Sequence, residues 1–369
     1  MKKIAIVLNS PWQAYNFRLN LARSLKNANY EVCFIAPYDK KYSTLLEKEF
    51  NCYYVNIDAK GVNPISDFKS IVSLYRIYKN INPHAVLNFT IKPNIYSSIV
   101  AGVLGIKVIS NITGLGTVFI KQTYVTKIAK LLYRFALKYN NKVFFQNKDD
   151  LNLFLKNTLV IEEKVDLLPG SGVDLNKFTP VQKQNNNKIV FLLIARLLKD
   201  KGVLEFIDAV KIIKKKYENV EFQILGAVGV ENKTAIIKEE LQSWIDDSLV
   251  SYLGTTDEVQ EIIAQCDCVV LPSYREGTPR SLLEACAMQK PIIATNVVGC
   301  KEVVDDGVNG YMCKVKDSKD LADKFDKMIH LTSEQRESMG IAGRKKIIKE
   351  FDEKLVIGKY CKSLKDIDV

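Results

Sequence analysis

The sequence predicts an α/β protein with two doubly wound, Rossmann-like domains that face each other across a cleft. At 369 residues the chain is long enough for two domains. Short, continuous apolar runs alternate with segments of helical length, and this alternation occurs twice along the chain. Apolar runs without polar alternation are typical of parallel strands in a sheet that helices cover on both faces.

A polar stretch at residues 182–188 separates the two series. We expect an N-terminal domain over residues 1–178, a C-terminal domain over 188–350, and a C-terminal helix over 351–369 that packs back towards the N-terminal domain. Strands of the first series are expected at residues 4–8, 31–37, 52–57, 85–89, 107–112, 142–147 and 165–170. Helices between them are expected at residues 16–27, 42–49, 67–79, 94–104 and 124–139. The second series of strands is expected at residues 189–195, 220–225, 250–253, 268–271, 291–295 and 310–313.

The composition is typical of a soluble globular chain, with 47% hydrophobic and 26% charged residues. No apolar run reaches the roughly 18 residues of a membrane span, and the opening residues favour a first strand over a signal peptide. The eight cysteines include no Cys-x-x-Cys pair, which indicates free thiols in a reducing cytosol. Cys266 and Cys268 need two further ligands to hold a metal, and with two histidines in the chain we expect no metal site.

Positive charge is concentrated in the first half of the chain. Residues 1–180 contain 24 Lys and Arg against 12 Asp and Glu, whereas the remainder is nearly neutral. An anionic surface or substrate, such as acidic lipid, a diphosphate lipid or nucleic acid, explains this asymmetry. A Lys-rich composition that serves solubility explains it equally well.

The stretch from Pro272 to Ala285 carries the clearest functional signal. It follows an apolar strand and leads into a helix, for which Thr278 is a suitable N-cap and Pro279 a suitable first residue. Free N–H groups and the helix dipole then form an anion site. Glu276 and Glu284 bracket this site, and carboxylates suit neutral hydroxyls rather than phosphate. A phosphate site between two hydroxyl-binding acids indicates a sugar nucleotide.

Two cations follow the first strand of the second series. Arg196 leaves the carboxyl end of that strand and Lys201 opens the next helix, so both could neutralise a diphosphate; solvated surface charges are the alternative. Gly226 and Thr255, the latter directly after Gly254, lie at the ends of the next two strands, where glycine permits close approach of a ligand. Ordinary turns explain these positions as well. A dinucleotide fingerprint and a Walker A motif are both absent.

Together, Arg196, Lys201 and the Glu276–Glu284 stretch resemble the retaining GT-B glycosyltransferases with the E-x7-E motif, glycosyltransferase family 4. The resemblance covers the whole chain and is densest over residues 188–310. The form Arg-Glu-Gly-Thr-Pro-Arg-Ser-Leu-Leu-Glu-Ala, with Ile293-Ala294-Thr295, and the segment Phe89–Tyr96 are similar to one bacterial branch. Members of that branch extend polyprenyl-diphosphate-linked sugars for O-antigen, capsule or protein glycosylation, N-acetylgalactosaminyl transfer to a bacillosamine-type lipid carrier among them.

The resemblance implies a role for each matching residue. Glu284 would bind the ribose hydroxyls and Glu276 the hydroxyls of the donor sugar, while Arg196 and Lys201 would hold the diphosphate. Backbone N–H groups of the anion site would come from Gly277, Thr278 and Arg280. On the acceptor side, the resemblance implies that the loop from Ser10 to Tyr15 and the turn containing Gly114 and Gly116 close over both substrates. No cofactor is implied, because the UDP-sugar is a substrate, and nucleic acid is not a partner.

The sequence departs from the family at one position. Many relatives have a histidine after the fourth strand, where this chain has Ile91 followed by Lys92, and His84 precedes that strand. A retaining transfer can proceed without an imidazole, because the leaving diphosphate oxygen can accept the proton of the acceptor. Lys92 would then stabilise negative charge as a further catalytic group.

Association with the inner face of the cytoplasmic membrane is also expected. Lys127, Lys130, Arg134 and Lys138 recur at helical spacing beside an apolar stripe, which fits an acidic membrane surface, although a solvated helix face explains the pattern equally well. The aromatic cluster of Trp12, Tyr15 and Phe17 suits lipid, sugar or local packing.

Taken together, these features favour a cytosolic, membrane-associating, metal-independent hexosyltransferase. It would move an N-acetylhexosamine, with GalNAc favoured, from a UDP-sugar to a polyprenyl-diphosphate-linked sugar. The alternatives are a GT-B-fold UDP-sugar 2-epimerase and a nucleotide-sugar-binding subunit without turnover.

Overall fold

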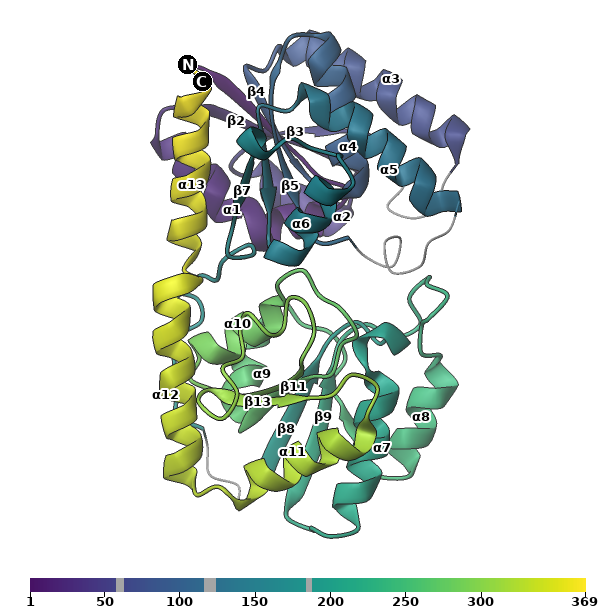
Figure 1. Ribbon diagram of the computed structural model, residues 1–369, viewed down its shortest axis with the longest axis vertical. Helices are drawn as coiled ribbons and strands as arrows, with labels where there is room; N and C mark the ends of the chain where they lie inside the picture. Colours follow the sequence, from purple (N-terminus) through teal and green to yellow (C-terminus); the bar gives the residue numbers. More distant parts are fainter. Residues whose placement is uncertain (58–62, 116–123, 184–187) are drawn as a thin grey trace. The chain divides into compact units, whose positions relative to one another are not determined.

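The computed structural model describes residues 1–57, 63–115, 124–183 and 188–369. The chain divides into two compact units, Met1–Ser171 together with Val356–Val369, and Gly172–Leu355 (Figure 1). Each unit contains one parallel sheet with helices on both faces. The prediction of two doubly wound α/β domains is therefore confirmed.

The first unit contains a seven-stranded sheet in the order β3-β2-β1-β4-β5-β6-β7. Its strands are β1 (Lys3–Val7), β2 (Glu31–Ala36), β3 (Asn51–Tyr54), β4 (Ala85–Phe89), β5 (Lys107–Ile112), β6 (Lys142–Phe145) and β7 (Val165–Leu167). One face is covered by α3 (Pro64–Ile81), α4 (Ile91–Val103), α5 (Tyr124–Ala136) and α6 (Lys148–Lys156). The other face is covered by α1 (Pro11–Asn27), α2 (Lys40–Glu47) and α13 (Glu353–Asp366). Two 3-10 turns, η2 (Leu137–Tyr139) and η3 (Glu162–Lys164), complete the unit.

The second unit contains a six-stranded sheet in the order β10-β9-β8-β11-β12-β13. Its strands are β8 (Ile189–Ile194), β9 (Val220–Leu225), β10 (Ser251–Tyr252), β11 (Cys268–Leu271), β12 (Ile292–Thr295) and β13 (Gly310–Cys313). One face packs on α7 (Val203–Lys214), α8 (Lys238–Asp246) and α11 (Ser318–His330). The other packs on α9 (Val259–Gln265), α10 (Arg280–Ala287) and α12 (Ser333–Glu350). A 3-10 turn, η4 (Lys199–Lys201), precedes α7.

The division between the units falls earlier than the expected end of the first domain at residue 178. The reason is the packing of residues 172–178 on the second unit. Val173 donates a backbone hydrogen bond to Phe351 at 2.9 Å and accepts one from Glu353 at 3.2 Å. The side chain of Phe178 is buried in the core of the same unit. These residues therefore belong to the second unit rather than to the first.

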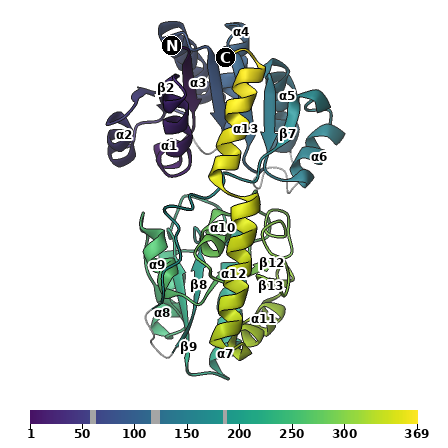
Figure 2. The ribbon, with the colours of Figure 1, turned by 90° about the vertical axis from the view of Figure 1, so that its left-hand side faces the viewer.

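The C-terminal helix α13 contributes directly to the core of the first unit (Figure 2). Tyr360 is fully buried between Phe89 of β4 and Phe144 of β6, with ring centroids 5.8 and 5.0 Å apart, and its hydroxyl accepts a hydrogen bond from Asn111 at 2.8 Å. Two segments at opposite ends of the sequence thus share one hydrophobic core.

Strand order places one ligand-binding edge in each sheet. In the first sheet β1 lies between β2 and β4, and in the second sheet β8 lies between β9 and β11. The chain therefore leaves β1 and β4, or β8 and β11, in opposite directions, which opens a crevice at the carboxyl ends of these strands. Arg196 and Glu276 follow β8 and β11, and Ser10 and Lys92 follow β1 and β4.

Candidate active site

The loops after β8 and β11 are joined at the crevice of the second sheet. Tyr274 donates a backbone hydrogen bond to the carbonyl of Asp200 at 3.0 Å. Gly202 has φ of +71°, and a Cβ atom there would lie 2.0 Å from the carbonyl oxygen of Pro272. Glycine is thus required both by the backbone conformation and by the close approach of the two loops.

This junction brings Lys201 and Glu276 together. The Lys201 Nζ atom lies 2.5 Å from the Glu276 Oε1 atom, and the two side chains are only 22% and 12% exposed. The backbone of Glu276 is fixed from the other side, because its N–H donates to the carbonyl of Val298 at 3.0 Å. Gly299, with φ of +89°, allows the loop after β12 to approach: a Cβ there would lie 2.7 Å from the carbonyl carbon of Glu276. Three loops therefore position this carboxylate.

Glu284 lies inside the helix that starts at the same crevice. It is 9% exposed, and its Oε1 atom accepts a hydrogen bond from Arg280 Nε at 3.0 Å. Burial raises the pKa of the Glu284 carboxyl, while the nearby charges of Arg280 and Lys177 act in the opposite direction. The helix begins one residue later than expected, with Pro279 rather than Thr278 at the N-cap. Thr278 is therefore outside the helix, because the backbone of Pro279 is still extended, with ψ of 115°.

Arg196 contrasts with these paired groups. Its side chain is exposed, and it makes no ion pair or side-chain hydrogen bond with the residues that the structure describes. Thr255 is also exposed at this edge. Gly226 serves packing between strand ends, since a Cβ there would lie 1.8 Å from the carbonyl oxygen of Ala195. Of the two predicted diphosphate ligands, Lys201 is paired with Glu276, whereas Arg196 has no acidic partner among the described residues.

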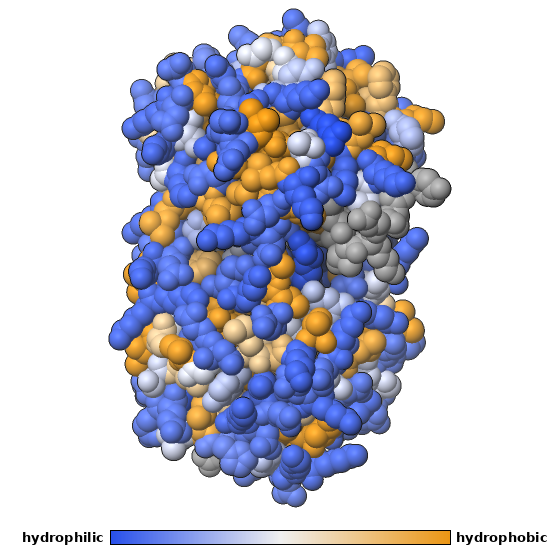
Figure 3. Space-filling view, in the orientation of Figure 1, coloured by the Kyte–Doolittle hydropathy of each residue, from blue (hydrophilic) through white to orange (hydrophobic). Residues whose placement is uncertain are grey.

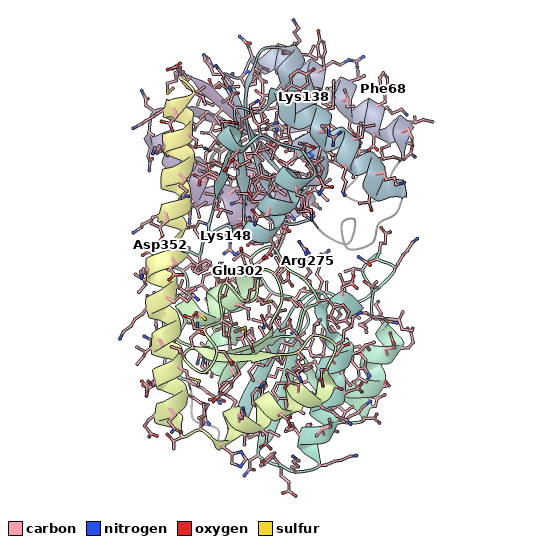
Figure 4. All side chains as sticks on the ribbon, viewed as in Figure 1. Phe68, Lys138, Lys148, Arg275, Glu302 and Asp352 are labelled. Carbon is pink, nitrogen blue, oxygen red and sulfur yellow. The ribbon has the colours of Figure 1, made fainter. Side chains whose placement is uncertain are left out.

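The side chains of Arg275 and Glu302 emerge from the loops after β11 and β12 (Figure 4). Gly299 donates a backbone hydrogen bond to Glu302 at 2.7 Å, which stabilises the loop that contacts Glu276.

In the first unit, Lys92 lies in the first turn of α4 and pairs with Asp67 of α3, Nζ to Oδ1 at 2.7 Å. Ile91 precedes Lys92 and occupies the position where many relatives have a histidine. Its side chain packs on the hydrophobic core under α4. Gly114 follows β5 with φ of +138°, and Gly116 lies outside the described residues.

The prediction of a loop from Ser10 to Tyr15 is wrong, because most of this segment is helical. Only Ser10 is extended, as the N-cap of α1, and the helix begins at Pro11 because proline fits the first helical position. The Trp12 ring packs edge-on against Phe17 at 5.0 Å, and the Tyr15 ring lies 6.0 Å from that of Tyr42. Both contacts are those of local packing.

Several residues that support the site were not singled out from the sequence. Tyr274 donates its hydroxyl to Glu205 of α7 at 2.7 Å, and Lys316 Nζ lies 4.8 Å from the Tyr274 ring centroid. In the first unit, Asp67, the partner of Lys92, was also not singled out from the sequence. A tyrosine–glutamate pair 69 residues apart carries no spacing signal, so only the fold brings these groups together.

Neither histidine lies at a carboxyl edge. His84 precedes β4 and accepts from the backbone N–H of Lys3 at 3.1 Å, and His330 ends α11 beside Asp326. Within the described ranges, no three His, Cys, Asp or Glu side chains gather as metal ligands. Cys266 and Cys268 are fully buried, and burial raises the pKa of both thiols.

Comparisons with known proteins agree with this architecture. Residues 3–147 match the glycosyl transferase 4-like model and residues 176–346 the glycosyl transferases group 1 model. The chain is 26% identical, over 98% of its length and 97% of the relative, to the N,N'-diacetylbacillosaminyl-diphospho-undecaprenol alpha-1,3-N-acetylgalactosaminyltransferase of Campylobacter jejuni. It is 25% identical, over 79% of its length and 78% of the relative, to the Escherichia coli UDP-Gal:alpha-D-GlcNAc-diphosphoundecaprenol alpha-1,3-galactosyltransferase.

Among solved structures, Anabaena Alr3699/HepE in complex with UDP and glucose superimposes with a TM-score of 0.82 at 18% identity, covering 99% of this chain and 100% of that one. Sucrose-phosphate synthase from Thermosynechococcus elongatus gives 0.82 at 13% identity, covering 100% and 99%. These likenesses concern the fold. With glycosyl transferase 4-like and group 1 domains that together match most of its length, the chain belongs to the GT-B glycosyltransferases.

Proposed function

We propose that this protein is a retaining, metal-independent transferase that moves an N-acetylhexosamine, GalNAc in the first instance, from a UDP-sugar to a hydroxyl of a polyprenyl-diphosphate-linked sugar. The observation that carries the proposal is the crevice of the second sheet. There the buried carboxylate of Glu284 and the largely buried one of Glu276 flank the start of α10, and Arg196, a cation without a partner among the described residues, lies at the neighbouring strand end. The names of the two bacterial relatives support the acceptor class.

Each residue has a role that its surroundings favour. Glu284 accepts hydrogen bonds from the ribose hydroxyls, and Glu276 accepts them from the donor sugar, since each carboxylate keeps lone pairs beyond those used by its cation. Arg196 and Lys201 bind the diphosphate, assisted by the N–H groups and dipole at the start of α10. Gly226 and Thr255 border the nucleotide, and Ser10, Tyr15 and Gly114 border the acceptor.

In the proposed reaction, the bond between the anomeric carbon and the diphosphate oxygen breaks while the acceptor oxygen bonds the same face of that carbon. The proton of the acceptor hydroxyl passes to the departing diphosphate oxygen, so no enzymic base is needed. The remote positions of His84 and His330 support this route. Stabilising the leaving group electrostatically is the main task of the protein.

The test is a panel of UDP-sugars against undecaprenyl-diphosphate-linked monosaccharides, with UDP release measured and the product linkage determined by NMR. Acceptor-dependent UDP release with an α-linked product is expected. Isomerisation of the UDP-sugar without acceptor indicates the 2-epimerase, and UDP-sugar binding without turnover indicates a silent binding subunit. A β-linked product would refute retention of configuration.

We further propose that the protein works at the cytoplasmic face of the inner membrane and binds it through α3 and α5. Apolar side chains gather over these helices (Figure 3); Phe68 of α3 is 65% exposed and Leu131 of α5 is 66% exposed. Phe68 projects from the outer side of α3 (Figure 4). Lys127 and Lys138 add positive charge beside them. No helix among the described residues is long and apolar enough to cross a bilayer, so the proposed attachment is peripheral.

Binding to vesicles of phosphatidylglycerol and phosphatidylcholine tests this proposal. The wild type should sediment with anionic vesicles at low salt and detach as salt rises. The Lys127→Glu/Lys138→Glu variant should remain in solution. A matched charge reversal on α12, Lys345→Glu/Lys349→Glu, should bind like the wild type; if it also detaches, net charge rather than this surface is responsible.

A further inference from the structure

The ion pair between Lys92 and Asp67 differs from an ordinary surface salt bridge. Both side chains are largely buried, with exposed fractions of 13% and 11%, and the two residues lie 25 positions apart on adjacent helices. Burying two charges costs desolvation energy that their attraction does not reliably recover, so a buried pair is weak evidence of a stabilising role. A positional role accounts better for this pair.

Tyr96 lies one turn beyond Lys92 on α4, and burial, followed by the neighbouring Asp67 carboxylate, raises the pKa of Tyr96. The Asp67 side chain is held by its ion pair with Lys92 of the neighbouring helix. Within the described part of the chain, Lys92 has no other ion pair or hydrogen bond. Two of its three N–H donors therefore remain available.

Backbone geometry fixes Lys92 at the carboxyl edge of the sheet. Thr90, between β4 and α4, has φ of 70° and ψ of 164°, a region that essentially only glycine populates. Its buried Oγ1 atom has no hydrogen-bond partner in the described part of the chain. This strained residue turns the chain abruptly from strand into helix, so Lys92 lies three residues beyond the end of β4, at the crevice between β1 and β4.

The pairing also determines what Lys92 can bind. A lysine beside a carboxylate at 2.7 Å forms a nearly neutral unit, whose field falls off faster than that of an isolated cation. Such a unit offers hydrogen-bond donors but little net charge. On its own, such a pair suits an uncharged oxygen, such as a sugar hydroxyl or an N-acetyl carbonyl, better than a diphosphate. In the proposed donor site, the pair of Lys201 and Glu276 serves a diphosphate because the exposed cation Arg196 lies at the neighbouring strand end. The exposed, uncompensated Arg196 has the opposite character.

We propose that Asp67 is a positioning residue that aims Lys92 at an uncharged sugar oxygen in the transfer reaction. Lys92 thereby contributes to recognition of the sugar rather than to charge neutralisation of the diphosphate. This inference rests on the proposed transferase function, and it assigns Asp67 a part in that function.

Turnover of Asp67→Asn, Asp67→Ala, Lys92→Ala and the double variant Asp67→Asn/Lys92→Met tests the proposal. The assay uses the UDP-sugar and undecaprenyl-diphosphate-linked sugar that give the fastest UDP release with the wild type. Asp67→Ala should lower kcat/KM by about 10²-fold, because misplacing a group that positions the substrate by about 1 Å costs that much. Asp67→Asn, whose amide oxygen still accepts from Lys92, should recover about tenfold of this loss. Calorimetric UDP affinity should stay within about twofold of wild type, since UDP binds the other unit.

The double variant guards against misfolding, because removing both charges leaves no unpaired buried charge. It should be no slower than Lys92→Ala alone, since Asp67 acts only through Lys92. The matched control is Asp267→Ala, which removes the carboxylate of the largely buried Lys183–Asp267 pair, 2.5 Å apart, at the amino end of β11. This control should lower Tm and leave kcat/KM within about twofold of wild type.

The inference is overturned if Asp67→Ala transfers at the wild-type rate, or if the losses in the double variant multiply. It is also overturned if Lys92→Ala is fully active while Asp67→Ala is not. Failure of the proposed function is separate: it appears as a wild-type protein that binds UDP but releases none from any UDP-sugar in the presence of acceptor.

Discussion

Replacing Gly202 by alanine perturbs the junction on which the candidate donor site depends. Alanine meets two obstacles there. The backbone φ of +71° lies in the left-handed region, which costs a residue with a Cβ atom about 1 kcal/mol. The new Cβ would also lie 2.0 Å from the Pro272 oxygen and 2.7 Å from its carbonyl carbon. Because both partners are backbone atoms, one loop must move by roughly 1 Å, and such overpacking typically costs about 1–3 kcal/mol.

We therefore expect Gly202→Ala to lower the free energy of unfolding of the second unit by about 2–4 kcal/mol. Urea denaturation followed by the fluorescence of Trp244, which is buried in that unit, measures this loss. Because Lys201 and Glu276 flank the displaced loops, kcat/KM should also fall by about 10²-fold.

Gly307→Ala is the matched control for this prediction. Gly307 has φ of +76°, and a Cβ there would have no neighbour within 4 Å. This variant isolates the conformational cost and should lose about 1 kcal/mol without loss of turnover. Equal destabilisation of the two variants, or full turnover by Gly202→Ala, would refute the reasoning from loop contact.

Three further predictions follow from single residues. Arg196→Ala should lower kcat/KM by about 10²-fold with a stability change within about 0.5 kcal/mol, because the side chain is exposed and unpaired within the described structure; turnover and Tm measured together check this. Burial raises the pKa of the Glu284 carboxyl above 4.5. A carboxyl whose pKa rises on folding stabilises the folded state at low pH. This stabilisation is lost as the pH rises through the raised pKa. The unfolding free energy of the wild type, measured by urea titration at several pH values, should thus fall relative to Glu284→Gln as pH rises above 4.5. Thr90→Gly should raise the unfolding free energy by about 1 kcal/mol, since relief of strain exceeds the entropy cost of glycine; a lower Tm would contradict the strain argument.

Much of the fold could be predicted because parallel strands buried on both faces are apolar throughout. The strands at residues 85–89, 107–112, 268–271 and 310–313 were predicted with the bounds that the structure has. Prediction was poorer where local signals were overlooked. Asn63 caps α3 by accepting from Ile65 and Ser66, and Pro64 occupies its first turn, so this helix begins three residues before the expected start.

The candidate site was predictable only in part. Glu276 and Glu284 lie in one stretch whose spacing can be read along the sequence, and each remains a candidate ligand. Their partners could not be deduced in the same way. Arg280 is one turn from Glu284, but Lys201 is 75 residues from Glu276, and only the parallel order β8–β11 places their loops side by side. Asp67 reaches Lys92 through the packing of α3 on α4, which no motif encodes.

The pairing of charges changes how the diphosphate is expected to bind. Lys201 and Arg280 each lie beside a buried carboxylate, so each pair contributes directed donors and acceptors but little net charge. A diphosphate needs net positive potential as well as hydrogen bonds. In the proposed site this potential would come from Arg196 and from the dipole at the start of α10. In the proposed site, such a division of labour would allow two glutamates to lie beside an anionic ligand: their cations would offset the repulsion locally, while Arg196 would supply the attraction.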